Sequence, residues 1–290
     1  MLETDYRQAA LPLFEEGAVD VLEWSFDMVW GDQRIPDWAD GLLDFYGGQN
    51  RLLGHGVSYS AFSGKWHHRQ EQWIESLRKE CDRRPYLHLS EHFGFMTAGS
   101  FHRSASLPVP RTAETRRIGR ERMVRLHDAC HVPVGLENLA FAFGRRDVEE
   151  QGRFLDEILE AVDGFLVLDL HNIHCQSCNF GVPALELIRR YPLERAWELH
   201  ISGGSWSESA AEPERGLIRR DTHDGAVPEA VFEMLPDVLA LCPNVRAVIF
   251  ERLGGTFHAA AEREQFARDF RRIHSILGER TANDRLSTPV

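Results

Sequence analysis

The sequence predicts a single α/β domain folded as a (β/α)8 TIM barrel, and three observations lead to this prediction. The chain has 290 residues, a length at which single barrels of this kind are common. Short apolar runs typical of β-strands recur along the chain, and amphipathic stretches typical of helices separate most of them. Eight strands that alternate with helices form a parallel sheet, and closure into a barrel is the commonest arrangement at that number.

Each element can be placed in order. Eight segments have the strand pattern: Val19–Trp24, Leu52–Ser58, Tyr86–Ser90, Val132–Glu137, Phe165–Leu170, Ala196–Ile201, Leu217–Thr222 and Val245–Glu251. Six segments have the helix pattern most clearly: Gln70–Arg83, Glu114–Cys130, Val148–Ala161, Ala184–Arg190, Glu229–Leu241 and Ala259–Ile276. The seventh strand is very short, and residues 203–216 before it are expected to form a loop without a helix. Residues 1–278 are expected to form the one domain, and residues 279–290, which lack an apolar pattern, a flexible tail.

The composition argues against several classes of protein. Lys and Arg total 33 and Asp and Glu total 45, so the formal net charge is −12, whereas proteins that bind nucleic acid through its phosphates need a basic face. No apolar run approaches the roughly 18 residues of a membrane-spanning helix, and the N-terminus shows no secretory signal. Five cysteines, an odd number, do not make a disulfide framework. We therefore expect a cytoplasmic protein that binds neither nucleic acid nor membrane.

Ionisable side chains recur on one face of the predicted strands. Successive strand residues point to opposite faces, so Leu166 and Leu168 should face the helices and leave Asp169 inside the barrel. A His or a carboxylate has this inward parity near the C-terminal end of seven of the eight strands, where barrel enzymes build their active sites. The residues at or just after these strand ends are His55, His92, Glu137, Asp169, His171, His200, Asp221, His223 and Glu251.

This set of side chains predicts a metal cluster. So many ionisable groups at one mouth would repel one another or lack solvation unless cations neutralised them. Imidazoles and carboxylates without an inward thiolate suit iron, manganese or zinc, and the set exceeds what one ion can coordinate. A single inward His is more often a hydrogen-bonded core residue, and a single carboxylate at a strand end often caps a helix, but the joint pattern favours a cluster. His88 and Glu198 face inward one layer deeper, where we expect packing or support of the ligands.

Seven short motifs follow one another along nearly the whole chain. They are His55-Gly56-Val57-Ser58, Ser90-Glu91-His92, Glu137-Asn138, Leu168-Asp169-Leu170-His171-Asn172, Glu198-Leu199-His200-Ile201, Asp221-Thr222-His223 and Phe250-Glu251-Arg252. In this order they resemble the multinuclear non-haem iron-dependent oxidative enzymes, a family formerly described as a domain of unknown function. The family includes the peptide-cysteine-modifying enzymes of the methanobactin-biosynthesis type.

The resemblance implies a barrel of the xylose-isomerase type that holds two or three irons of mixed Fe(II)/Fe(III) valence. By motif match, one iron would be held by His55, His92 and Glu137. A second would be held by Asp169, His200 and Glu251, with Glu137 as a bridge. A third, more labile iron would be held by Asp221 and His223, with help from the loop after the fifth strand.

The resemblance also implies an activity. Family members commonly oxidise cysteines in ribosomally made precursor peptides with dioxygen as co-substrate, often with a small partner protein that captures the leader of the peptide. In the implied reaction the substrate thiolate binds one ferric ion, dioxygen binds a neighbouring ferrous ion, and a hydrogen is removed from the cysteine β-carbon. We therefore expect oxidative modification of a precursor peptide in peptide natural-product biosynthesis.

Two other classes of function remain as alternatives. Barrels of this type also hold zinc clusters that cleave phosphodiesters, as in endonuclease-IV-like enzymes, or paired divalent ions that isomerise sugars. The net charge of −12 counts against a DNA substrate, and the order of the motifs counts against both activities. The other alternative is a metal-loaded scaffold or binding protein without catalysis.

The chain departs from the family pattern at two places. Where the family usually has two asparagines after the fifth-strand aspartate, this chain has His171-Asn172 and then His174, and either imidazole could be an added ligand. Where the family often has a Gly-His pair after the sixth strand, residues 202–205 read Ser-Gly-Gly-Ser, so one histidine is missing. This absence puts full occupancy of the third site in question.

Four further residues are expected to support the ligands or to contact the substrate: Asn138, Asn172, Cys175 and Cys178. The two cysteines form a CxxC in the loop predicted after the fifth strand. They are either two incidental thiols near the mouth or a pair that forms a disulfide or exchanges with a thiol substrate.

Overall fold

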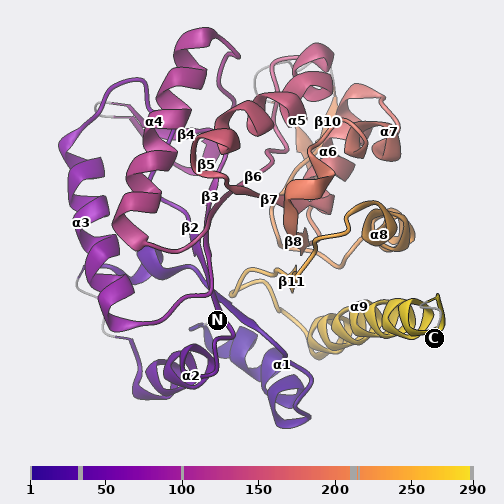
Figure 1. The fold of residues 1–290 in the computed structure, drawn as a ribbon. Coiled ribbons are helices and arrows are strands. Elements are labelled where there is room, and N and C mark those ends of the chain that lie inside the picture. The colour runs from indigo at the N-terminus through magenta and orange to yellow at the C-terminus, as the bar shows by residue number, and fades with distance from the viewer. Residues whose placement is uncertain (1, 32–34, 99–100, 210–213, 215, 288–290) are drawn as a thin grey trace.

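Seven parallel strands form one sheet that curves into a nearly closed barrel, with helices on its outer side (Figure 1). The computed structural model describes residues 2–31, 35–98, 101–209, 214 and 216–287. The order of the strands in the sheet is β1 (Leu22–Trp24), β2 (Leu52–Gly56), β3 (Leu89–His92), β6 (Val134–Glu137), β7 (Phe165–Asp169), β8 (Ala196–Ile201) and β11 (Ala247–Phe250). The predicted α/β barrel class is therefore confirmed, with one strand fewer in the described sheet than expected.

The helices pack around this sheet. In chain order the α-helices are α1 (Thr4–Glu15), α2 (Asp37–Gly48), α3 (His68–Arg83), α4 (Ala113–Cys130), α5 (Arg145–Leu159), α6 (Leu170–Phe180), α7 (Ala184–Ile188), α8 (Glu229–Leu241) and α9 (Ala260–Ser287). In the described part of the chain, three short 3-10 helices lie between these elements: η1 (Phe26–Val29), η2 (Glu160–Val162) and η3 (Leu193–Arg195). Because α9 runs to Ser287, much of residues 279–290 is helical, and the flexibility expected there stays a prediction. No helix in the described part of the chain combines the length and apolar character that a membrane crossing requires.

The seventh predicted strand was placed wrongly. Leu217–Arg219 forms β10, which pairs antiparallel with β9 (Trp206–Glu208) in a separate two-stranded sheet. Leu217 and Trp206 are both exposed, so this pair has no apolar face that could be buried between a barrel and its helices. A second antiparallel pair, β4 (Phe95–Ala98) with β5 (Phe101–Leu107), was not predicted at all.

The α6 segment was also predicted wrongly, as a loop. The Asp169 side chain accepts a hydrogen bond from the backbone N–H of Asn172, which caps the N-terminus of the helix. Gly181, with a φ of 65°, takes the left-handed conformation that ends it. The helix therefore begins directly at the end of β7 and carries five residues of the expected site: His171, Asn172, His174, Cys175 and Cys178.

The core divides into two layers around the sheet. Outside the sheet, Leu166, Leu168 and Leu199 are fully buried, and each such leucine stabilises the fold by roughly 1.5–3 kcal/mol. Inside the barrel a smaller apolar cluster, with Leu53 and Ile249 at its centre, lies two residues before His55 and Glu251 on the same strands. This cluster forms an apolar floor beneath the ionisable side chains.

The helices α1 and α9 cover the place where the barrel is not closed by hydrogen bonds. No ladder joins β1 to β11 within the described residues. Leu13 of α1 and Phe266 of α9 belong to one buried cluster, against which Val19, just before β1, and Phe250 of β11 pack. Figure 1 shows α1 and α9 near one another on this side of the molecule. The two ends of the chain thus cover the open side of the barrel.

Candidate metal centre

Strand register brings the expected ligands to one level at the C-terminal ends of the strands. His92 is paired with Glu137 across β3 and β6, and Asp169 is paired with His200 across β7 and β8. The backbone N–H of Glu251 donates to the carbonyl of Ile201, which sets the end of β11 beside the end of β8. The alternation that buries the leucines outside therefore turns these imidazoles and carboxylates toward a shared interior.

The first group of candidate ligands is His55, His92 and Glu137. The Nε2 atoms of the two histidines lie 3.5 Å apart, and each lies 3.4 Å from Oε2 of Glu137. Nδ1 of His92 contacts the carbonyl oxygen of Gly56 at 3.1 Å, and since a carbonyl only accepts, this nitrogen carries the proton. Nδ1 of His55 bonds to the Ser90 hydroxyl at 2.7 Å. Both rings thus present Nε2 to the carboxylate, the orientation that a shared cation needs.

The second group is Glu137, Asp169, His200 and Glu251, whose nearest ligand atoms all lie within 4.8 Å of one another. Nδ1 of His200 lies 3.3 Å from Oε2 of Glu251 and 3.7 Å from Oε1 of Glu137. Glu137 therefore offers one oxygen to each group. The first two implied ligand sets are brought together in the structure as two adjoining positions that share a carboxylate.

His88 and Glu198 lie beneath these groups, in the deeper layer where the sequence placed them. Nε2 of His200 donates to Oε1 of Glu198 at 2.9 Å, and Oε2 of the same carboxylate accepts from Nε2 of His88 at 2.6 Å. This contact fixes the proton of His200 on Nε2 and leaves the Nδ1 lone pair facing the second group. The side chains of His88 and Glu198 are almost completely buried, so no water competes for these bonds.

Several buried polar atoms of the expected ligands have no hydrogen-bond partner. They are Oε2 of Glu137, Oδ2 of Asp169, Nδ1 of His200, Nε2 of His223 and Oε2 of Glu251. A buried polar atom left without a partner costs about 1–3 kcal/mol, and more when it is charged. Five such atoms from five segments at one barrel mouth therefore fit a cation site, and an imidazole and carboxylate set suits a transition metal.

The pKa shifts show how strongly the groups depend on opposite charge. Burial raises the pKa of Asp169 well above its usual value, and the nearby carboxylates of Asp221 and Glu137 raise it further. Burial opposes ionisation of Glu137, but His92 and His200 hold the pKa of that carboxyl well below its usual value. Burial also disfavours a charged His92, yet Glu137 raises the pKa of His92 to about 10. Without a cation, protonated imidazoles must supply the positive charge.

Asp221 and His223 adjoin the second group. Nε2 of His223 lies 2.9 Å from Oδ1 of Asp221 and 3.8 Å from Oε2 of Glu251. The contact with Asp221 lacks hydrogen-bond geometry, because Nε2 has no hydrogen-bond partner at all. Both side chains are thus placed beside a third position, although no set of three ligand atoms closes around it among the described residues.

His171 has both ring nitrogens occupied. Arg219 donates to Nε2 from its Nη2 atom at 3.2 Å, and a guanidinium can only donate, so Nε2 is the acceptor. Nδ1 then carries the proton and donates to Oδ1 of Asp221 at 2.9 Å. Burial lowers the pKa of His171, which favours this neutral form. The geometry therefore favours a role for His171 in orienting Asp221, and it does not favour His171 as a metal ligand.

His174 lies farther from the centre. Its ring centroid is 6.0 Å from that of His171, and its Nε2 atom faces Sγ of Cys178 at 3.7 Å. Burial lowers the pKa of His174 to about 4. Among the described residues, the structure does not bring His174 into either group of candidate ligands.

The two asparagines hold the ligands in place. Asn172 donates from Nδ2 to Oε1 of Glu137 at 3.2 Å and to the backbone carbonyl of Asn138 at 2.9 Å. Oδ1 of Asn138 accepts from the backbone N–H of Asp169 at 2.7 Å, and Nδ2 returns a bond to the Asp169 carbonyl at 3.1 Å. These contacts fix the ends of β6 and β7 relative to each other.

The CxxC cysteines are free thiols in the structure. Cys175 is fully buried and lies 3.9 Å from Nδ1 of His171, whereas Cys178 is exposed beside His174. Positions 171, 174, 175 and 178 share one face of α6, so the thiols follow the imidazoles along the helix.

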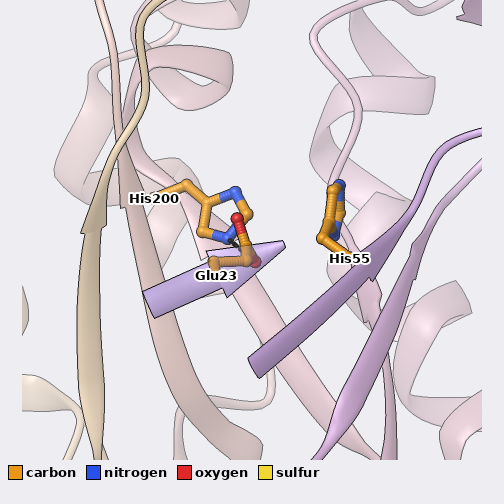
Figure 2. A group of neighbouring side chains, drawn as sticks. All are labelled: Glu23, His55 and His200. Carbon is orange, nitrogen blue, oxygen red and sulfur yellow. Dashed lines mark ion pairs between the residues drawn. The ribbon is translucent and has the colours of Figure 1, made fainter. Parts of the chain in front are cut away.

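Sequence reasoning missed two carboxylates of the site. Glu23 of β1 lies between the buried residues Leu22 and Trp24 and points to His200 inside the barrel (Figure 2). The alternation of these three residues was the available signal. Glu91 is buried and accepts from the backbone N–H groups of Tyr59 and His92, each at 2.8 Å, so it anchors the segment after β2.

Comparison with known proteins adds the family. The model of a family described as RiPP precursor modification enzymes MbnB/TglH/ChrH matches residues 38–274. The chain belongs to this family. RiPPs are ribosomally synthesised and post-translationally modified peptides, so the family match makes this chain one of the enzymes that modify a peptide precursor.

Relatives of this RiPP precursor modification enzyme are UPF0276 proteins. One from Shewanella loihica is 26% identical over 226 residues, which cover 78% of this chain and 76% of the relative. One from Shewanella oneidensis is 28% identical over 237 residues, 81% of each chain. One from Pseudomonas aeruginosa is 32% identical over 148 residues, 50% of this chain and 49% of the relative.

Solved structures with the same fold confirm the xylose-isomerase-like barrel. The IOLI protein with a bound zinc atom matches with a TM-score of 0.59 at 12% identity, over 96% of this chain and 94% of that one. Endonuclease IV from Thermus thermophilus matches with a TM-score of 0.55 at 15% identity, over 93% and 94% of the two chains. At these identities the likeness shows the fold of the RiPP precursor modification enzyme and nothing about its reaction.

Proposed function

We propose that this protein uses iron and dioxygen to oxidise a cysteine of a ribosomally synthesised precursor peptide in peptide natural-product biosynthesis. The observation that carries the proposal is the convergence of buried, unpartnered nitrogen and oxygen atoms at one barrel mouth. Imidazoles and carboxylates without a thiolate suit iron, which can change valence, as an oxidation requires. The membership of the chain among RiPP precursor modification enzymes supplies the peptide substrate.

The residues fall into three candidate iron positions. The first would be held by His55, His92 and Glu137, and the second by Asp169, His200 and Glu251 with Glu137 shared. The third would be held by Asp221 and His223 beside Glu251. We keep His171 as the support of Asp221 and leave His174 outside the centre, because their nitrogens face Arg219, Asp221 and Cys178.

The exposure of the candidate ligand side chains indicates the side from which a substrate can reach the centre. The side chain of His92 is 29% exposed and that of His223 is 22% exposed, whereas that of His200 is 0% exposed. Iron bound here would bind a thiolate, activate dioxygen and accept single electrons. The open side formed by His92, Asp221 and His223 would receive the peptide thiol, and the buried side would keep water from the inner ligands.

The rim of the mouth offers apolar surface to a peptide. Phe143, Trp206 and Leu253 are exposed and lie on the segments that follow β6, β8 and β11. Exposed apolar side chains gathered around a site are typical of surfaces that bind other chains. We propose that the precursor peptide binds here and that a small leader-recognising partner protein delivers it.

The test is metal analysis followed by turnover. Protein prepared without oxygen should contain iron with a Mössbauer spectrum of both valences. With a cysteine-containing peptide encoded beside its gene, it should consume dioxygen and change the peptide mass, whereas the Cys→Ser peptide should stay unchanged. A colourless zinc protein with phosphodiesterase or sugar isomerase activity would replace the proposal with one of the two alternative enzyme classes. If the protein bound metal but consumed no dioxygen when peptide and partner were added, it would be a metal-loaded scaffold without catalysis.

A further inference from the structure

Glu23 is the middle residue of β1, the strand for which the sequence predicted no ligand. Figure 2 shows its carboxylate close to the His200 ring and facing the space between that ring and His55. Its side chain is 8% exposed, and Oε2 lies 3.3 Å from Nε2 of His200. One ligand atom from each of Glu23, His55 and His200 can be chosen so that all three lie within 4.8 Å of one another.

A purely structural role does not account for this carboxylate. The single proton on Nε2 of His200 already goes to Glu198, at 2.9 Å and with hydrogen-bond geometry. Oε2 of Glu23 has no hydrogen-bond partner. His200 lies within ion-pair distance of Glu23 but gives its Nε2 proton to Glu198, so Oε2 of Glu23 stays without a donor, which is unfavourable for a buried oxygen and more so when it is charged.

The two neighbouring imidazoles limit what Glu23 can bind. Nδ1 of His55 is bonded to Ser90, which leaves Nε2, and Nε2 of His200 is bonded to Glu198, which leaves Nδ1. Both remaining nitrogens already serve the two positions described above. Glu23 therefore does not define an independent fourth ion with histidines of its own, and it can only add an oxygen to the ions that His55 and His200 face.

We propose that Glu23 is a carboxylate ligand of the metal centre, supplied by β1 from the deep side of the barrel. This inference rests on the proposed metal centre, but it requires neither peptide nor dioxygen. It makes β1 a functional strand and adds one negative charge to the charges that balance the cations. It also explains why a carboxylate oxygen without a hydrogen-bond donor lies next to a histidine whose Nε2 proton goes to Glu198.

The test compares two isosteric substitutions in the same buried layer, with ferrous iron alone as the probe. Glu23→Gln removes the charge at nearly constant volume, and Glu198→Gln makes the same change in a carboxylate that is hydrogen-bonded on both oxygens. For each anaerobic protein we would measure the iron dissociation constant by chelator competition, the iron content, and the melting temperature with and without iron.

For Glu23→Gln we expect iron to bind at least tenfold more weakly and to raise the melting temperature less than in the native protein. The melting temperature of the iron-free variant should be unchanged or higher, because a buried unpartnered charge is gone. For Glu198→Gln we expect the iron-free protein itself to melt at a lower temperature. If Glu23→Asp is used as a second variant, it should keep the charge and recover part of the affinity.

The inference would be overturned if Glu23→Gln bound iron with native affinity and iron raised its melting temperature as much as in the native protein. It would also be overturned if the iron-free Glu23→Gln protein lost as much melting temperature as iron-free Glu198→Gln. If Glu23→Gln did not fold, native iron affinity in Glu23→Ala, which has no ligand oxygen at this position, would overturn it equally. Native protein that binds no transition metal would overturn both this inference and the proposed function. Weakened iron binding in Glu23→Gln together with no oxidation of any peptide would support the ligand and overturn only the proposed reaction.

Discussion

His171 and Asp221 lie 2.9 Å apart, Nδ1 to Oδ1, and this bond ties the helix after β7 to the segment after β10. Arg219 completes the arrangement by donating to the other nitrogen of the same ring. Because the guanidinium donates to Nε2, the neutral His171 ring carries its proton on Nδ1. That N–H then donates a hydrogen bond to Asp221. Arg219 thus orients a carboxylate beside the candidate metal centre through the His171 ring that lies between them.

Arg219→Met should weaken metal binding without unfolding the protein. Without the guanidinium His171 can place its proton on either nitrogen, and Asp221 loses a fixed donor. Loss of a residue that supports a ligand typically lowers metal affinity by about 10- to 100-fold. The matched control is Arg220→Met, since Arg220 donates to Ser207 and Glu208 on β9 and not to His171. Equal iron affinities for the two variants, measured by chelator competition, would contradict this role.

Gly204→Ala should destabilise the protein, because the backbone at this position has no room for a side chain. A Cβ would lie 2.2 Å from the carbonyl oxygen of Arg220 and 2.7 Å from Cε1 of His171. Forcing a methyl group into such a site costs about 1–3 kcal/mol. Gly41→Ala is the control, because Gly41 is in α2 with open space around it and alanine should stabilise that helix by up to about 1 kcal/mol. Urea unfolding of both variants measures the difference.

His92→Ala and Glu137→Ala should differ in how much iron they lose. His92 belongs to the first group alone, so its removal should leave the four-residue second group loaded. Glu137 belongs to both groups, so its removal should reduce iron at both positions. Both variants, and Asp169→Ala, should lose turnover while the barrel stays folded. Iron content per chain, with circular dichroism as the folding check, tests this, and full iron with full activity in any variant would remove that residue from the ligand set.

His88→Ala should lower stability more than it lowers metal content. Its Nε2 atom donates to Glu198 at 2.6 Å, and its ring packs edge-on against Phe165 with centroids 4.6 Å apart. Removal of the imidazole takes one donor from the buried Glu198 carboxylate, and a hydrogen bond to such a group contributes about 1.5–3 kcal/mol. His127→Ala, at an exposed position on α4, should leave stability unchanged. A His88→Ala protein with native melting temperature but no iron would contradict the structural role.

The two cysteines of α6 should react very differently with alkylating reagents. Cys178 is exposed and should be modified in the folded protein, whereas Cys175 should react only after unfolding. Burial raises the pKa of both thiols, so even Cys178 should react more slowly than a free thiol. Peptide mass spectrometry after iodoacetamide treatment measures each site. Any increase in labelling after reduction would mean that the resting protein holds a disulfide.

The part of the site that could be predicted is the part carried by long strands. In β7 and β8 leucines on one parity leave Asp169 and His200 on the other, so their inward direction follows from alternation alone. Glu23 was missed because β1 has three residues and thus a single inward position, too few for a repeating pattern.

The elements beyond the strands were harder to predict, for two physical reasons. The β10 segment has only two apolar residues, a run that fits a hairpin as well as a barrel strand. The α6 segment is rich in His, Asn, Ser and Cys, residues with weak helix propensity. The local cap from Asp169 and the tertiary contact with Arg219 outweigh that preference. The role of His171 depends on the latter contact, which spans 48 positions in the chain and leaves no local signal.

Because Glu137 belongs to both groups of candidate ligands, iron binding at the two positions should be coupled when iron is scarce. One of its oxygens faces each group, so an ion on either side would hold the carboxylate in the orientation that the other side needs. Through this carboxylate, occupancy of one position would favour occupancy of the other, against the repulsion between the two cations, and the coupling would be reciprocal. Where the orienting effect exceeds that repulsion, half-filled native molecules would be scarce when iron is limited, and total activity would track the number of complete centres.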